Sequence, residues 1–79
     1  MRRLKLIWDF RGPVAQQTAL HHEIHLKEYA VAEGLKESLT GTTTINEMHT
    51  LAFLVLNEEE MPAVRDALKP HRGQLYQEK

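Results

Sequence analysis

The chain of 79 residues contains no cysteine and only one serine, Ser38. Without cysteine, disulfides, iron–sulfur clusters and zinc–thiolate sites are all excluded. The single serine does not combine with the histidines in a triad-like pattern, so the sequence indicates no serine nucleophile. The four glycines are scattered singly. That spacing excludes a glycine-rich phosphate loop and argues against nucleotide-dependent chemistry.

The chain also lacks an excess of charge of one sign, because its 10 lysines and arginines nearly balance its 11 acidic residues, for a net charge of −1. Arg2, Arg3 and Lys5 form a small cluster without interleaved aromatic residues, so we expect no nucleic-acid partner. The apolar stretch behind this cluster is short and is broken at Asp9, which argues against a signal peptide or a membrane span. We therefore expect a cytoplasmic protein that makes no membrane contact.

Residues 1–79 are expected to form a single domain, because the chain is too short to divide. A domain of this size buries only about 60% of its unfolded surface and therefore has a thin core. Small domains often gain stability from a bound metal or from a partner chain. Both remain open for this chain, and a partner chain is the commoner solution.

The first half of the chain predicts a strand followed by a long helix. Apolar and polar side chains alternate over residues 4–11, which is typical of a half-buried strand. The helix is expected to begin at Pro13, a residue that is preorganised for the first helical position, and to extend to about Glu33. Gly34 then follows as a left-handed terminator of the helix.

The second half predicts two more strands, a short helix and one further segment. Residues 38–48 are rich in threonine, which favours an edge strand, whereas residues 49–57 are apolar on both sides, as in a central strand. Residues 58–69 predict a helix, with Pro62 in its first turn. Residues 73–77 are either a short final strand or a tail.

This order predicts an α+β domain of the ferredoxin-like split β-α-β type, with an antiparallel sheet and both helices on one face. The other face would then be uncovered, although residues 51–56 are apolar on both sides. A second copy of the chain would cover it, so we expect a homodimer through the open sheet face. Over most of its length this pattern resembles the dimeric α+β-barrel proteins. The resemblance implies either a small ligand-binding domain or a small enzyme that needs no cofactor.

Three of the five histidines fall within "HHEIH" at residues 21–25. At 100° per residue, the helix face expected to meet the core carries Val14, Thr18, His22, His25, Tyr29 and Ala32. His21 falls nearer the edge of that face, and Glu23 lies on or near the opposite side. His22, His25 and Tyr29 are therefore the candidate catalytic residues.

Two interpretations of these inward-facing side chains need no metal. In the first, the histidines are neutral, hydrogen-bonded and simply fill space in the core. In the second, His22, His25 and Tyr29 line a small-molecule pocket between the long helix and the sheet. A histidine near its ordinary pKa of about 6.5 would also serve there as a general base.

A third interpretation is a site for a divalent metal such as zinc. His21 and His25 have the i, i+4 spacing of the HExxH motif, but His22 stands where the glutamate of that motif would be. His22 and His25 are the better pair, and His49 is the candidate third ligand, because a catalytic zinc site needs three. His22 is on the order of 13 Å from the start of the helix, so convergence with His49 is not assured.

A second candidate site lies at the ends of the expected strands. In the expected topology Arg11, His49, His71 and Arg72 meet at one edge of the sheet, with Asp9 on a neighbouring strand. Such a rim would attract an anion, or it would be a solvated edge with one or two ion pairs worth roughly 0–1 kcal/mol each. The candidate ligand-binding residues are Trp8, Arg11, His49 and His71.

Overall fold

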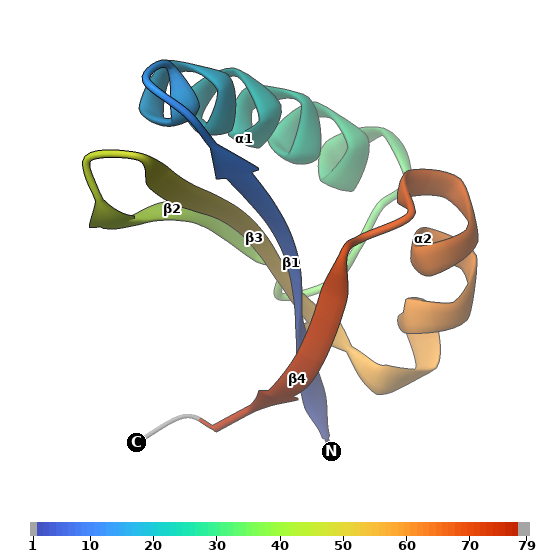
Figure 1. Cartoon of the computed structure of the whole chain (residues 1–79). Coiled ribbons are helices and arrows are strands. Elements are labelled where there is room, and N and C mark those ends of the chain that lie inside the picture. Colours follow the sequence, from blue (N-terminus) through green and yellow to red (C-terminus); the bar gives the residue numbers. More distant parts are fainter. Residues whose placement is uncertain (1, 78–79) are drawn as a thin grey trace.

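Four antiparallel strands form one sheet in the order β2-β3-β1-β4, and two helices lie on one side of it (Figure 1). The computed structural model describes residues 2–77. The elements are β1 (Arg3–Arg11), α1 (Ala15–Ala32), β2 (Leu39–Asn46), β3 (His49–Asn57), the 3₁₀ turn η1 (Glu58–Glu60), α2 (Met61–Leu68) and β4 (Arg72–Tyr76). The sheet is strongly twisted, so β4 stands steeply against β2 in Figure 1.

The strand order gives two interlocked strand–helix–strand units. β1 and β2 run parallel with β3 between them, while β3 and β4 run parallel with β1 between them. This is the split β-α-β arrangement predicted from the sequence. The short final strand is present as β4, the apolar run forms the central strand β3, and the threonine-rich segment forms the edge strand β2.

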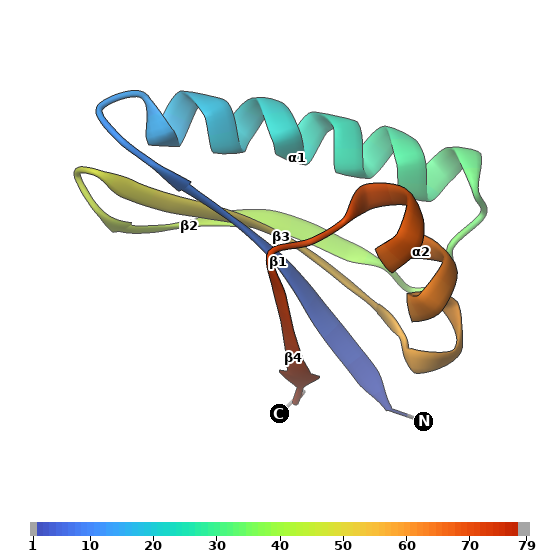
Figure 2. The same ribbon diagram turned by 45° about the vertical axis from the view of Figure 1, so that its right-hand side comes forward.

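Both helices pack on the same face of the sheet (Figure 2). The core cluster consists of Leu6, Trp8, Ala19, Leu26, Ala52, Leu54, Leu56 and Val64. Trp8 also ties α2 to the sheet, because its indole Nε1 donates a hydrogen bond of 3.1 Å to the carbonyl oxygen of Leu68. Within residues 2–77, no helix has the combined length and apolar character that crossing a membrane requires.

The long helix ends as the sequence predicts, at a left-handed glycine. Gly34 has a φ of +65°, a conformation that costs a residue with a Cβ atom more. The amide of Leu35 donates to the carbonyl oxygen of Ala30 (3.0 Å), and the amide of Gly34 donates to that of Val31 (3.2 Å). These two bonds form a Schellman motif, which satisfies carbonyl groups that the helix end leaves unpaired.

The rotation of α1 differs from the prediction, by about a quarter of a turn at 100° per residue. The residues buried against the sheet are Ala15, Ala19, Leu26 and Ala30. Alanines allow the helix to approach the strands closely. The helix therefore buries this alanine-rich stripe rather than the stripe with the larger side chains that the periodicity predicts. His22 and Tyr29 stay half-buried, but His25 is exposed. Glu23, expected on the far side, accepts a hydrogen bond of 3.3 Å from Thr40 Oγ1 of β2.

We call the side of the sheet without helices the open face. Its centre is already covered within a single chain, because Ile7 and Val55 are only 2% and 0% exposed. Phe53 lies across Gly41 of β2, where an added Cβ would come within 2.6 Å of the ring Cζ. The ammonium group of Lys5 lies 4.4 Å from the centre of the same ring. The apolar residues that suggested a covering partner are therefore largely shielded by their own neighbours.

Candidate functional site

Residues 8–10 of β1 organise the candidate site, because consecutive strand residues point to opposite faces of the sheet. Trp8 and Phe10 point toward the helices and pack with the core. Asp9 points to the open face, as does its cross-strand neighbour Leu51. Two groups of side chains result. We call them the Asp9 network (Asp9, His49, His71 and Arg72) and the His22 cluster (Trp8, Phe10 and His22).

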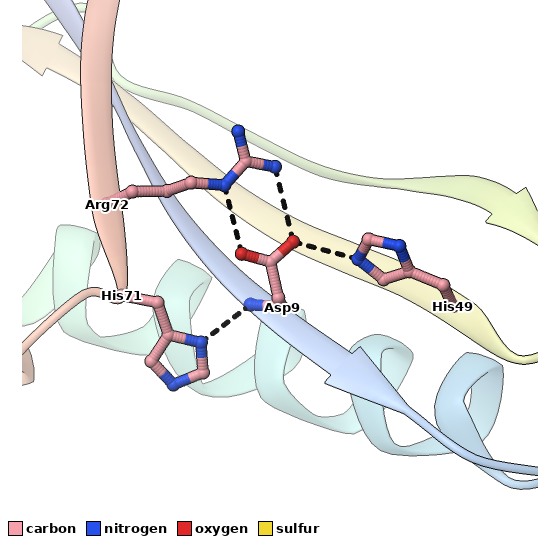
Figure 3. A network of polar contacts seen from close by, with 4 residues as sticks. All are labelled: Asp9, His49, His71 and Arg72. Atoms are coloured by element: carbon pink, nitrogen blue, oxygen red, sulfur yellow. Dashed lines mark hydrogen bonds and ion pairs between the residues drawn. The ribbon is translucent and has the colours of Figure 1, made fainter.

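The Asp9 carboxylate holds together side chains from three strands (Figure 3). Arg72 of β4 binds it in a bidentate manner, with Nε 3.0 Å from Oδ2 and Nη2 3.2 Å from Oδ1. His49 of β3 places Nε2 2.8 Å from Oδ1. Both carboxylate oxygens are therefore engaged, and the network links the central strand β3 to the edge strand β4 through β1.

This arrangement stabilises the charged form of Asp9. The hydrogen bond from Arg72 is the largest contribution, and it is opposed by partial burial and assisted by His49. Together they lower the pKa of Asp9 from 3.8 to about 2. The hydrogen bond to Asp9 likewise raises the pKa of Arg72. At neutral pH the network therefore contains a stable carboxylate–guanidinium pair rather than a group poised for proton transfer.

His71 contacts the backbone of Asp9 and not its carboxylate. The Asp9 amide N–H donates to His71 Nδ1 at 2.8 Å, which requires Nδ1 to be unprotonated. Asp9 lies beyond the last β1–β4 pair, Ile7↔Arg72. The His71 imidazole therefore accepts the hydrogen bond that a backbone carbonyl of β4 would accept if the pairing continued. The His71 ring also lies 6.4 Å from that of Phe10, which brings it to the border of the His22 cluster.

The His22 cluster lies between α1 and the sheet. The centroid of the His22 ring is 5.0 Å from that of Trp8 and 5.4 Å from that of Phe10, and both pairs are tilted. Burial is the main cause that lowers the pKa of His22 below 6.5, with smaller contributions from the nearby charges of His25 and His71. His22 is therefore neutral at pH 7.

One atom of this cluster is left without a partner. The Nε2 atom of His22 is buried, and no group within residues 2–77 hydrogen-bonds to it. Buried polar atoms in folded proteins almost always have a partner, which is another protein group or an ordered water molecule. Nε2 is therefore the place in this cluster where a bound molecule would gain a hydrogen bond.

The other predicted site residues do not join these groups. The His25 side chain is 63% exposed on α1 and pairs with Glu28 at 3.4 Å, so its predicted inward orientation is wrong. Its ring lies 4.9 Å from that of His21, which is also exposed. Tyr29 packs against the edge of the core cluster. Arg11 is exposed opposite His49 and is not among the side chains that bind Asp9.

The predicted metal ligands do not converge. His22 lies on the helix side of the sheet, His49 lies on the open face, and His25 is exposed on α1. Within the described part of the chain, no three histidine, aspartate or glutamate side chains are arranged to hold a metal ion. The combination of His22, His25 and His49 is therefore wrong as a ligand set.

The rim predicted at the strand ends is largely present, since His49, His71 and Arg72 do meet around Asp9. The contact between Phe10 and His22 is not predicted from the sequence. The alternation over residues 4–11 places Trp8 and Phe10 on the same side of the strand, but the partner on α1 depends on the rotation of that helix. Comparison with models of protein families, with curated proteins and with solved structures found no match.

Proposed function

We propose that this domain binds a small polar molecule at the His22 cluster. The observation that carries the proposal is the buried Nε2 atom of His22, which has no hydrogen-bond partner within residues 2–77. A ligand with one hydrogen-bonding group would satisfy this atom and pack against the half-buried Phe10, while the buried Trp8 lies on the core side of the cluster. Small-molecule sites commonly combine apolar and aromatic walls with very few polar groups.

The charge state of His22 favours a ligand whose contacting group is uncharged. A neutral imidazole offers one donor and one acceptor nitrogen, so it pairs with a hydroxyl, an amide or a carbonyl group. An anionic ligand would gain most from a charged imidazole, and burial disfavours that form of His22 by lowering its pKa. We therefore expect neutral hydroxyl or amide compounds to bind better than carboxylates at this site.

The Asp9 network supports the same site from the other face of the sheet. It fixes the end of β1, and thereby the directions of Trp8 and Phe10, through the ion pair with Arg72 and the backbone bond to His71. In this proposal Asp9 is a positioning residue, since its carboxylate is fully engaged on the open face.

A fragment screen monitored by NMR tests the proposal. Small aromatic or cyclic amides and alcohols should shift the imidazole ¹⁵N signals of His22 and the indole signal of Trp8. His22→Phe should abolish the shift of the Trp8 indole signal, and the matched variant His21→Phe, at an exposed position, should leave the shifts of His22 and Trp8 unchanged. Binding that persists in His22→Phe, or hits that shift only other residues, would refute the proposal.

The lowered pKa of His22 favours a second candidate function, acid–base catalysis in which His22 is the general base. A base must be unprotonated at the working pH, and His22 meets this condition at pH 7. A hit from the screen that carries a C–H group next to a carbonyl would then lose this proton to His22 and regain one from solvent, so in D₂O the wild type should exchange it for deuterium and His22→Gln should not. Equal exchange in both proteins would exclude this function.

We also propose that two copies pair through the open face. The support is geometric, because no helix within residues 2–77 covers this face and Leu39, on its β2 edge, stays 46% exposed although the centre of the face is shielded. Apolar side chains in that position gain by contact with a second surface. Sedimentation analysis measures the pairing directly.

A further inference from the structure

A groove separate from the His22 cluster lies between α2 and the edge strand β4. Its volume is about 400 Å³, and its walls are mostly apolar, with Leu4 and Leu6 from β1, Met61 from α2 and Leu75 from β4. We call it the α2–β4 groove. Pockets of roughly 300–1,000 Å³ are the usual size for small-molecule sites, so this groove is large enough for one such ligand.

The polar rim of the groove has charges of one sign. Arg2 and Arg65 border it, and no carboxylate is among the described residues that line it. Arg72 also borders the groove, but its guanidinium is bound to Asp9 on the open face. Of the arginines that line the groove, Arg2 and Arg65 therefore lack an ion pair as strong as the one between Arg72 and Asp9, and both are available to a ligand in the groove.

Both arginines have only loose partners of their own. Arg2 Nε is 3.6 Å from Glu58 Oε2, and Arg65 Nε is 3.5 Å from Asp66 Oδ1, with all four side chains largely exposed. Exposed ion pairs of this kind contribute little to stability. A ligand carboxylate with bidentate geometry therefore competes for these arginines at little cost.

We propose that the α2–β4 groove binds an apolar carboxylate, with its hydrocarbon part against Leu4, Leu6, Met61 and Leu75 and its head group at Arg2 and Arg65. The apolar walls exclude small hydrophilic anions, which would gain nothing from burying them. The cationic rim disfavours apolar cations of the same shape. The site is independent of the proposed function at His22, since the two share no lining residue.

NMR titration of the whole chain with decanoate below its micelle concentration tests this proposal. We expect shifts at Leu6, Gly73 and Leu75 with decanoate and none with acetate or with decyltrimethylammonium. Arg2→Gln combined with Arg65→Gln should weaken decanoate binding roughly tenfold, because two exposed charge contacts together are worth up to about 1.4 kcal/mol. Arg11→Gln, an exposed arginine outside the groove, is the matched control and should not change it.

A second pair of variants tests the apolar part of the site. Leu75 and Leu39 are each 46% exposed on edge strands, so glutamate at either position should leave the fold intact, which circular dichroism checks. Leu75→Glu should abolish decanoate binding and Leu39→Glu should preserve it. Equal binding of the cationic and anionic probes, loss of binding in Leu39→Glu, or groove shifts on raising protein concentration without decanoate would each overturn the proposal.

His22→Phe separates this inference from the proposed function. Decanoate should bind this variant as it binds the wild type. Loss of decanoate binding in His22→Phe would overturn the independent groove, whereas failure of the fragment screen at His22 has no effect on it.

Discussion

Asp9 and Arg72 are joined by a bidentate ion pair that crosses from the central part of the sheet to its short edge strand. The pair is diagonal, because the residue opposite Arg72 in the ladder is Ile7. β4 pairs with β1 over five positions only, so this contact and the bond from Asp9 to His71 extend a short ladder by side chains. The edge strand is thereby fixed at the end where its own backbone stops pairing.

Replacing Asp9 with asparagine should therefore loosen β4 and reduce stability. We expect a loss of about 1–2 kcal/mol at pH 7, below the full value of the pKa shift because Arg72 is half exposed. Chemical denaturation measures the loss. Asp66→Asn is the control, because Asp66 is exposed and its contact with Arg65 is long. A similar loss in both variants would show that the Asp9 network has no special weight.

The same pair predicts a dependence on acidic pH. The pKa of Asp9 is about 2 in the folded protein and 3.8 ordinarily, so its contribution is fully present above about pH 4. It is lost as the pH falls from there to about 2, because the unfolded chain takes up the proton first. The stability difference between wild type and Asp9→Asn should shrink over this range. A constant difference down to pH 2 would contradict it.

His22 predicts a second pH dependence, in a different range. Burial lowers its pKa below 6.5, so the unfolded chain binds a proton more readily than the folded protein does. The contribution of His22 is therefore fully present above pH 6.5 and declines as the pH falls below it. His22→Phe should flatten the pH dependence of the unfolding free energy on the acidic side of pH 6.5, and His21→Phe should not. The same slope in all three proteins would contradict this.

The contact between Gly41 and Phe53 predicts a packing effect on the open face. Gly41→Ala should cost about 1 kcal/mol, at the low end for overpacking, because the far edge of the ring is able to swing away. The ring would then also leave Lys5. Combining Gly41→Ala with Phe53→Leu should remove most of the penalty, which a double-mutant cycle by denaturation measures. Strict additivity of the two changes would contradict the contact.

The open face predicts how salt affects pairing of two copies. Its strand residues include Arg3, Lys5, Arg11 and Arg72 but a single carboxylate, Asp9. Two such faces brought together repel each other at low ionic strength, and salt screens this repulsion. Sedimentation should therefore show more dimer at high salt than at low salt. A monomer at every salt concentration would contradict pairing through this face.

The sequence predicts the strands and helix ends well because those signals are local. The alternation over residues 4–11, the two-sided apolar run of β3 and the glycine at position 34 each depend on a few adjacent residues. The strand order follows from them, since few arrangements connect such elements with short loops. The meeting of His49, His71 and Arg72 around Asp9 was predictable for the same reason.

The orientation of α1 was not predictable in this way. Periodicity favoured a stripe that contains His22 and His25, but the chain buries the alanine stripe beside it, because close approach of helix and sheet gains more. A shift of one position around the helix is enough to turn His25 outward. The α2–β4 groove was not predictable from the sequence either, because its existence depends on the distance between the short helix α2 and the edge strand β4.

Because side chains alternate along residues 8–10, the orientation of both groups of side chains depends on the same strand register. Trp8 and Phe10 serve the helix side and Asp9 serves the open face only while β1 keeps its register with β3. Deleting one residue between Lys5 and Asp9 would exchange the two sides, so that Asp9 would point toward the core and Trp8 and Phe10 toward the open face. This stretch of chain thus tolerates substitution far better than a change in its length.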